Sequence, residues 1–63
     1  MAWVAVDQDG DEYIYRDKPQ RRINHTYWIN SLGDPNVIQI QTGSIKKLIG
    51  RTITWDDEPV ELT

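Results

Sequence analysis

The sequence predicts a small, mostly β domain with one short helix, and two observations carry this prediction. Short runs rich in Val, Ile, Tyr, Trp and Thr recur along the 63 residues and are separated by clusters of Gly, Pro, Asp and Asn. One stretch, residues 44–49, has the apolar spacing of a helix and a glycine on each side. We therefore expect a single domain over 1–63, a twisted antiparallel meander of about five to six short strands, partly barrel-like.

A β-hairpin is expected to open the chain. An Asp-Gly pair at residues 9–10 separates the β-rich runs 3–6 and 13–15, and this dipeptide between two such runs is a strong hairpin signal. A two-residue turn would place Val6 opposite Tyr13. The same register would also set two acidic residues opposite each other, which is unfavourable, so a wider turn remains an alternative.

The remaining elements follow from the turn-forming residues. Polar composition and proline predict loops at 16–25 and 31–36. Strands are expected at 27–29, 37–41, 52–55 and 60–63, the last at an edge because a proline precedes it. The helix should begin with Ser44 as its N-cap and end before Gly50, and its apolar face should pack as a lid on the sheet.

Size and composition limit the possible functions. A chain of 63 residues buries a thin core, so a homodimer would add stability, and the absence of cysteine excludes disulfides and thiolate zinc sites. The chain start lacks the features of a secretory signal, and no apolar run is long enough for a membrane span. We expect a cytoplasmic protein with no membrane contact.

Both ends of the chain resemble known proteins of one kind. Residues 43–51 and 54–62 resemble the ends of small uncharacterised proteins carried by bacteriophages and prophages, and residues 3–7 with Gly10 and Lys18-Pro19 are similar to their starts. The resemblance covers these two ends and carries no catalytic or binding residues. It implies an accessory protein that binds and blocks a host protein, including a defence factor, in the host cytosol.

A basic segment flanked by aromatic residues is the main candidate site. Basic residues interleaved with aromatics are typical of single-stranded nucleic-acid binding, but a net charge of −3 repels a phosphate backbone. We therefore expect a protein partner, with nucleic acid, a small phosphorylated ligand or a merely solvated loop as alternatives. The predicted partner-binding residues are Tyr15, Arg16, Lys18, Arg21, Arg22, Tyr27 and Trp28.

The aromatic residues permit two interpretations. The chain has three Trp and three Tyr and no Phe, so every ring carries a polar group of the kind enriched at interfaces. In the two-residue register Trp3 lies on the opposite hairpin face from Tyr13 and Tyr15. Either the rings form the core and its rim, or one set is exposed for a partner or for self-association as a structural component.

The start of the predicted helix is a weak candidate for anion binding through Ser44, Lys46 and Lys47. Lysines in a first helical turn oppose the helix dipole, so a negative group is expected nearby. A ligand could supply it, and so could the acidic residues of 56–58.

Enzymatic and metal chemistry are not predicted. His25 is the single histidine, there is no cysteine, and the serines lie where turns and a helix cap explain them. The acidic residues at 7, 9 and 11 have the spacing of a calcium loop, but its glycine comes too early and Lys18 stands where the bidentate glutamate belongs. We expect no catalytic residues, no cofactor and no metal.

Overall fold

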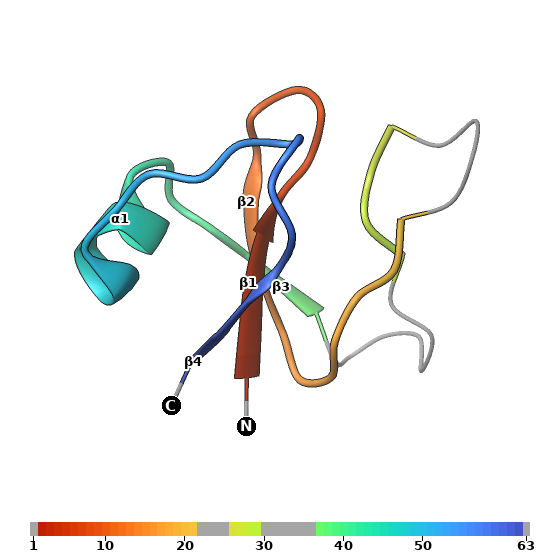
Figure 1. The fold of residues 1–63 in the computed structure, drawn as a ribbon, viewed down its shortest axis with the longest axis horizontal. Helices are drawn as coiled ribbons and strands as arrows, with labels where there is room; N and C mark the ends of the chain where they lie inside the picture. The colour runs from red at the N-terminus through yellow and green to blue at the C-terminus, as the bar shows by residue number, and fades with distance from the viewer. Residues whose placement is uncertain (1, 22–25, 30–36, 63) are drawn as a thin grey trace.

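The computed structural model describes residues 2–21, 26–29 and 37–62, and these form an antiparallel sheet with one short helix. Its elements are β1 (Ala2–Val6), β2 (Glu12–Tyr15), β3 (Val37–Ile40), α1 (Ser44–Ile49) and β4 (Val60–Leu62). The strand order is β3-β2-β1-β4, so the last strand returns to pair with the first and the two chain ends lie side by side (Figure 1). This confirms the predicted mostly β domain with one helix.

The strand arrangement corrects three parts of the sequence prediction. The described residues form four strands rather than five or six, and the sheet is not closed into a barrel. The sheet is also not a simple meander, because β4 crosses over to the far side of β1. Read from β4, the order is that of a Greek key.

The opening hairpin forms, but with a wider turn than a two-residue loop. Gly10 has φ 94° and donates its N–H to the Asp7 carbonyl at 2.9 Å, and the Asp7 N–H donates to the Asp11 carbonyl at 2.9 Å. This is a turn followed by a bulged glycine. Val6 therefore pairs with Glu12 rather than with Tyr13, a shift of one residue.

The shift in register decides which side chains share a face, because neighbouring residues of a strand point to opposite sides. Trp3 pairs with Tyr15 and Ala5 with Tyr13, so these rings lie on one face and not on opposite faces as the two-residue register predicts. The other face carries most of the aliphatic residues of the sheet. The first cluster is built from Ala5, Tyr15, Trp28, Trp3, Tyr13, Val37 and Trp55, and the second from Val4, Val6, Ile45, Ile53, Ile14, Ile40, Ile49, Val60 and Leu62.

The sheet therefore lies between two covering layers, as Figure 1 shows. α1 lies on one side, where Ile45 packs against Val4 and Val6. The segment 16–29, as far as it is described, lies on the opposite side and contributes Trp28 to the aromatic cluster. Packing of α1 on the sheet confirms the predicted lid.

Two predicted strands are not strands. Residues 27–29 contribute a single bridge, Gln20 to Ile29, whose two N–H···O bonds measure 3.0 and 2.8 Å. Residues 52–55 run into a turn in which Asp57 accepts the Thr54 N–H at 2.8 Å and returns its own N–H to the Thr54 carbonyl at 3.0 Å. An acidic side chain that caps its own turn competes with strand pairing. The predicted turn at 31–36 lies outside the described residues.

α1 starts one residue earlier than the sequence suggests. Gly43 is its N-cap, with φ 97°, and Ser44 is the first helical residue and provides no side-chain cap. The helix ends as predicted at Gly50, whose φ of 79° lets its N–H reach the Lys46 carbonyl at 2.9 Å. Within the described ranges, no helix has the length and apolar character needed to cross a membrane.

Candidate functional site

The segment 16–29, as far as it is described, is called the basic segment below. Arg21 holds this segment against the C-terminal part of the chain. Its guanidinium lies 4.5 Å from the ring centroid of Trp28 and 4.5 Å from that of Trp55. The same group donates hydrogen bonds to the Trp55 carbonyl and, at 3.3 Å, to the Asp57 carbonyl. A planar guanidinium can stack on rings and donate at its edge at the same time, which an ammonium cannot do. Arg21 is thus a clamp between two segments distant in sequence.

Trp28 fixes the segment to the opening hairpin. Its side chain is only 5% exposed, and its indole Nε1 donates to the Val6 carbonyl at 2.9 Å. Its backbone N–H donates to Oδ1 of Asp7 at 2.9 Å, and its ring meets Trp55 edge-on with centroids 5.6 Å apart. Both N–H groups of this tryptophan donate to acceptors within the protein, so Trp28 is a structural anchor.

Asp7 is the buried acidic partner in this arrangement. Loss of hydration on burial raises the pKa of the Asp7 carboxyl, the Trp28 N–H opposes the rise, and the nearby Asp9 and Asp11 charges add to it. Beside it, the Gln8 N–H donates to the Thr26 carbonyl at 3.0 Å. The hairpin turn and the basic segment are therefore joined by two hydrogen bonds, one from a backbone amide to a carboxylate and one between backbones.

Tyr15 lies in the aromatic core and not on the surface. It is 2% exposed, and its ring centroid lies 6.2 Å from that of Tyr13. Burial raises the pKa of its phenol well above the ordinary value of 10, with smaller contributions from Asp7 and Tyr13. The expectation that Tyr15 and Trp28 offer an exposed aromatic surface is therefore wrong, because the actual register and the Trp28 hydrogen bonds turn both rings inward.

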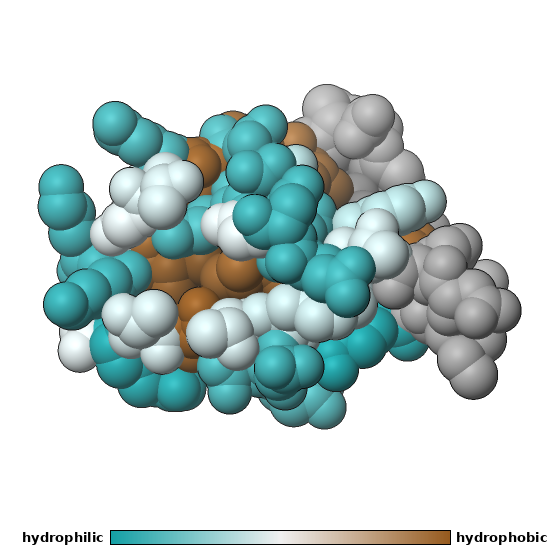
Figure 2. All heavy atoms as spheres, turned by 90° about the horizontal axis from the view of Figure 1, so that it is seen from above, coloured by the Kyte–Doolittle hydropathy of each residue, from teal (hydrophilic) through white to brown (hydrophobic). Residues whose placement is uncertain are grey.

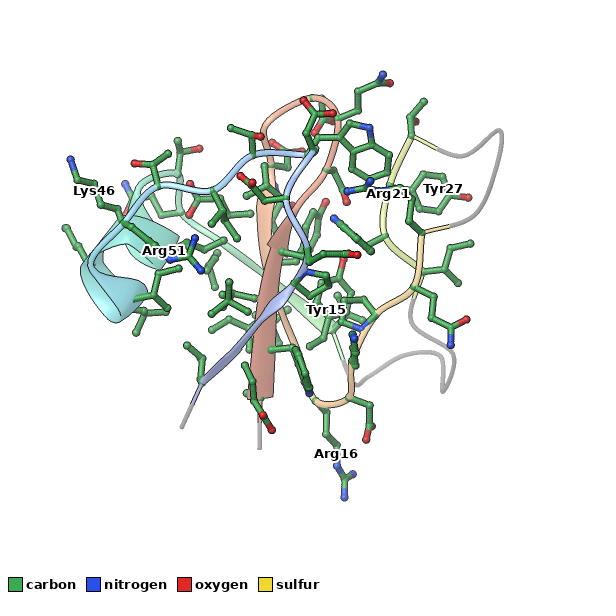
Figure 3. The ribbon with its side chains drawn as sticks, in the orientation of Figure 1. Tyr15, Arg16, Arg21, Tyr27, Lys46 and Arg51 are labelled. Atoms are coloured by element: carbon green, nitrogen blue, oxygen red, sulfur yellow. The ribbon has the colours of Figure 1, made fainter. Side chains whose placement is uncertain are left out.

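The outward side chains of the segment form what we call the loop surface, made of Arg16, Lys18, Gln20 and Tyr27. Tyr27 is 49% exposed, and Figure 3 shows it and Arg16 pointing away from the body of the protein at opposite ends of the segment. The Lys18 ammonium lies 5.5 Å from the centre of the Trp3 ring, which limits its freedom. Arg22 of the predicted set lies outside the described residues.

The predicted anion site is occupied from within the chain. Oε2 of Glu12 accepts the Gly43 N–H and its Oε1 accepts the Ile45 N–H, both at 2.9 Å. The expected negative group is thus Glu12, on a neighbouring strand, and not one of the acidic residues of 56–58. Lys46 and Lys47 are exposed, and Figure 3 shows Lys46 pointing away from the sheet. A carboxylate already fills the position that an external anion would take.

The described residues line two shallow hollows on the surface. One, of about 550 Å³, lies at the hairpin end, and its lining includes Val6, Glu12 and Ile53. Figure 2 looks onto this end and shows hydrophobic surface in gaps between hydrophilic side chains. The other, of about 570 Å³, lies beside the Arg21 clamp. Across the described parts of the chain, no group of three or more His, Cys, Asp or Glu side chains is placed to hold a metal.

Sequence reasoning missed three residues that organise this region: Asp7, Glu12 and Trp55. Each acts through a contact with a segment far away in the chain, and a sequence pattern does not report such contacts. One signal was present for Glu12, because lysines close to the start of the predicted helix indicated a nearby negative group. For Trp55 there was no such signal, because nothing in the sequence indicates that Arg21 stacks on its ring.

No family model, curated protein or solved structure matches this chain. The comparisons therefore supply neither a family nor a relative whose role could be carried over. The resemblance of the two chain ends to small phage proteins stays a prediction.

Proposed function

We propose that this chain is a non-enzymatic binding protein that recognises another protein through the loop surface. Following the resemblance of its two ends, the partner we propose is a host protein that a phage-encoded accessory factor occupies and blocks. Tyr27 serves as the aromatic contact, and Arg16 and Lys18 serve as the charged contacts, because aromatic and basic residues together are typical of interface centres and rims.

The observation that carries this proposal is the clamp around Arg21. The connection from β2 to β3 runs from residue 16 to residue 36 and is far longer than the hairpin turn that would suffice to join two antiparallel strands. Long connections in small domains are usually either functional loops or disordered segments, and the described part of this one is held by two tryptophans, an arginine and a buried aspartate. A surface segment held in this way loses little entropy on binding.

Charge favours an acidic protein partner. The described loop surface carries Arg16 and Lys18, whereas the chain as a whole has a net charge of −3. A folded protein with a local acidic patch can meet these two cations without bringing a whole line of phosphates against the remaining negative charge. A nucleic-acid backbone cannot avoid that repulsion, since it carries charge at every nucleotide.

The test is affinity capture with charge-reversed variants, followed by identification of the captured protein and calorimetry with that protein. The variant Arg16→Glu with Lys18→Glu should weaken the complex by about tenfold or more, since each charge contributes electrostatic complementarity at the interface. The matched control is Lys46→Glu with Lys47→Glu, which makes the same change in net charge on α1. Tyr27→Ala should also weaken binding.

Equal binding of the same protein by both double variants would remove the loop surface from the proposal. A single-stranded oligonucleotide provides the second probe. If it binds with affinity that falls steeply with salt and is lost in the Arg16 and Lys18 variant, the ligand is nucleic acid and the protein-partner proposal fails.

A further inference from the structure

We infer that the outer edge of β3 is the interface of a homodimer, in which the β3 strands of two copies pair antiparallel about a two-fold axis at Gln39. In the parts of the chain that the structure describes, β3 pairs only with β2, which makes it an edge strand of the sheet. The loop surface lies on the aromatic side of the sheet, so this inference is independent of the proposed function.

The direction in which the backbone groups of β3 point follows from the hairpin. The Asp7 N–H bonds to the Asp11 carbonyl, and hydrogen-bonded pairs alternate along antiparallel strands. Tyr13 and Tyr15 therefore bond toward β1, and Glu12 and Ile14 bond toward β3. Their β3 partners are Ile40 and Ile38. The N–H and C=O groups of Val37 and Gln39 consequently point to the outer edge, where they can pair with another strand.

The side chains of β3 match a second copy of themselves. Ile38-Gln39-Ile40 reads the same in both directions, so pairing Gln39 with the second copy's Gln39 sets each Ile38 opposite an Ile40. Ile38 is 62% exposed on the α1 side of the sheet, and such a pairing would cover it. Leu48, on the helix that packs on the same side, is 52% exposed. A dimer would therefore bury apolar surface that one copy leaves in water.

The distribution of charge favours self-association at the β3 edge over the β4 edge. β3 contains no charged residue, although 27% of the chain is charged and the net charge of −3 repels copies that approach elsewhere. The opposite edge, β4, is preceded by Pro59 and carries the exposed Glu61, both of which discourage pairing with another strand. A domain with a thin core also gains stability from oligomerisation.

The experiment measures mass by light scattering coupled to size-exclusion chromatography on the full chain. Loading concentrations run from roughly 10 µM to 1 mM, which covers the dissociation constants of weak association. The mass should rise from 7.4 kDa toward twice that value. Gln39→Glu sets two carboxylates face to face across the axis and should raise the dissociation constant by about tenfold or more.

The matched control is Gln20→Glu, which makes the same change of side chain and charge at an exposed position of the loop surface. It should leave the dimer unchanged. Amide hydrogen exchange gives a second readout, since the Gln39 N–H should become protected only as the dimer forms. A monomer at every concentration overturns the inference, and so does a dimer that Gln39→Glu leaves intact or a Gln39 amide that stays unprotected in the dimer.

Discussion

Replacement of Arg21 by alanine tests the clamp that organises the aromatic side of the protein. The guanidinium stacks on two tryptophan rings, each at 4.5 Å, and each cation–π contact at an exposed site contributes about 0.5 to 1 kcal/mol. Its hydrogen bonds to the Trp55 and Asp57 carbonyls add about 1 kcal/mol together in a solvent-exposed setting. We expect Arg21→Ala to lower the free energy of unfolding by about 2 to 3 kcal/mol.

The assay is thermal unfolding followed by tryptophan fluorescence and near-ultraviolet circular dichroism. In a domain of this size a loss of about 1 kcal/mol lowers the Tm by about 4 to 8 °C, so Arg21→Ala should lower it by roughly 10 to 20 °C. Arg21→Lys keeps the charge but loses the planar group that stacks and donates, and it should show about half of this loss. Arg51→Ala, at an exposed position after α1, is the control and should change stability by less than about 0.5 kcal/mol.

A double-mutant cycle separates the Arg21 contact from general effects of charge. Combining Arg21→Ala with Trp55→Leu should give a coupling energy of about 0.5 kcal/mol or more, because the two side chains touch in the folded protein. If Arg21→Ala lowers the Tm no more than Arg51→Ala does, or if the coupling energy is zero, the clamp does not hold the segment and the reasoning fails.

Three further predictions concern the hairpin and its neighbours. Glu12→Ala removes the carboxylate that accepts two N–H groups at the start of α1 and should cost about 1 to 2 kcal/mol in chemical denaturation, with Glu12→Gln intermediate; equal stability of all three proteins would contradict the cap. The pKa of Tyr15 is raised in the folded state, so above pH 10 the unfolded chain loses this proton more readily and the free energy of unfolding should fall, whereas below pH 10 it should not change for this reason. Tyr15→Phe should reduce this fall in thermal unfolding measured at alkaline pH. An unchanged slope would show that other groups cause it. Gly10→Ala should lower the free energy of unfolding by about 1 to 2 kcal/mol, measured as a lower Tm, because the φ of 94° is unfavourable for alanine. A steric clash is not the cause, since nothing lies within 4 Å of the added methyl group. No loss would mean that the turn can change its conformation.

The candidate site was only partly visible in the sequence. The basic segment and its aromatic neighbours were identified, and Arg16, Lys18 and Tyr27 are indeed on the surface. The sequence could not show which aromatic rings are buried, because their burial depends on a shift of one residue in the register of the hairpin. An Asp-Gly pair fits both a two-residue turn and a turn with a bulged glycine, and the two choices put opposite sets of side chains on each face.

Local patterns were sufficient for the elements whose hydrogen bonds are local. The hairpin at residues 9–10, the helix that ends before Gly50 and the edge strand after Pro59 were all predicted, since turns, helix ends and edges depend on a few neighbouring residues. The same patterns predicted a strand at 52–55 that does not form. There, alternation of apolar residues is genuine, but the Asp57 carboxylate bonds to Thr54 and closes a turn.

By itself, the sequence determined the class of the protein: a small, mostly β domain with one short helix and a basic, aromatic-flanked segment. The tertiary structure alone decided that β4 returns to β1, that Glu12 caps α1, and that Arg21 stacks between Trp28 and Trp55. Apart from the stacking of Arg21 on Trp28, each of these contacts joins residues more than twenty positions apart. These contacts form only after folding has brought separate segments of the chain together, so no local sequence pattern predicts them.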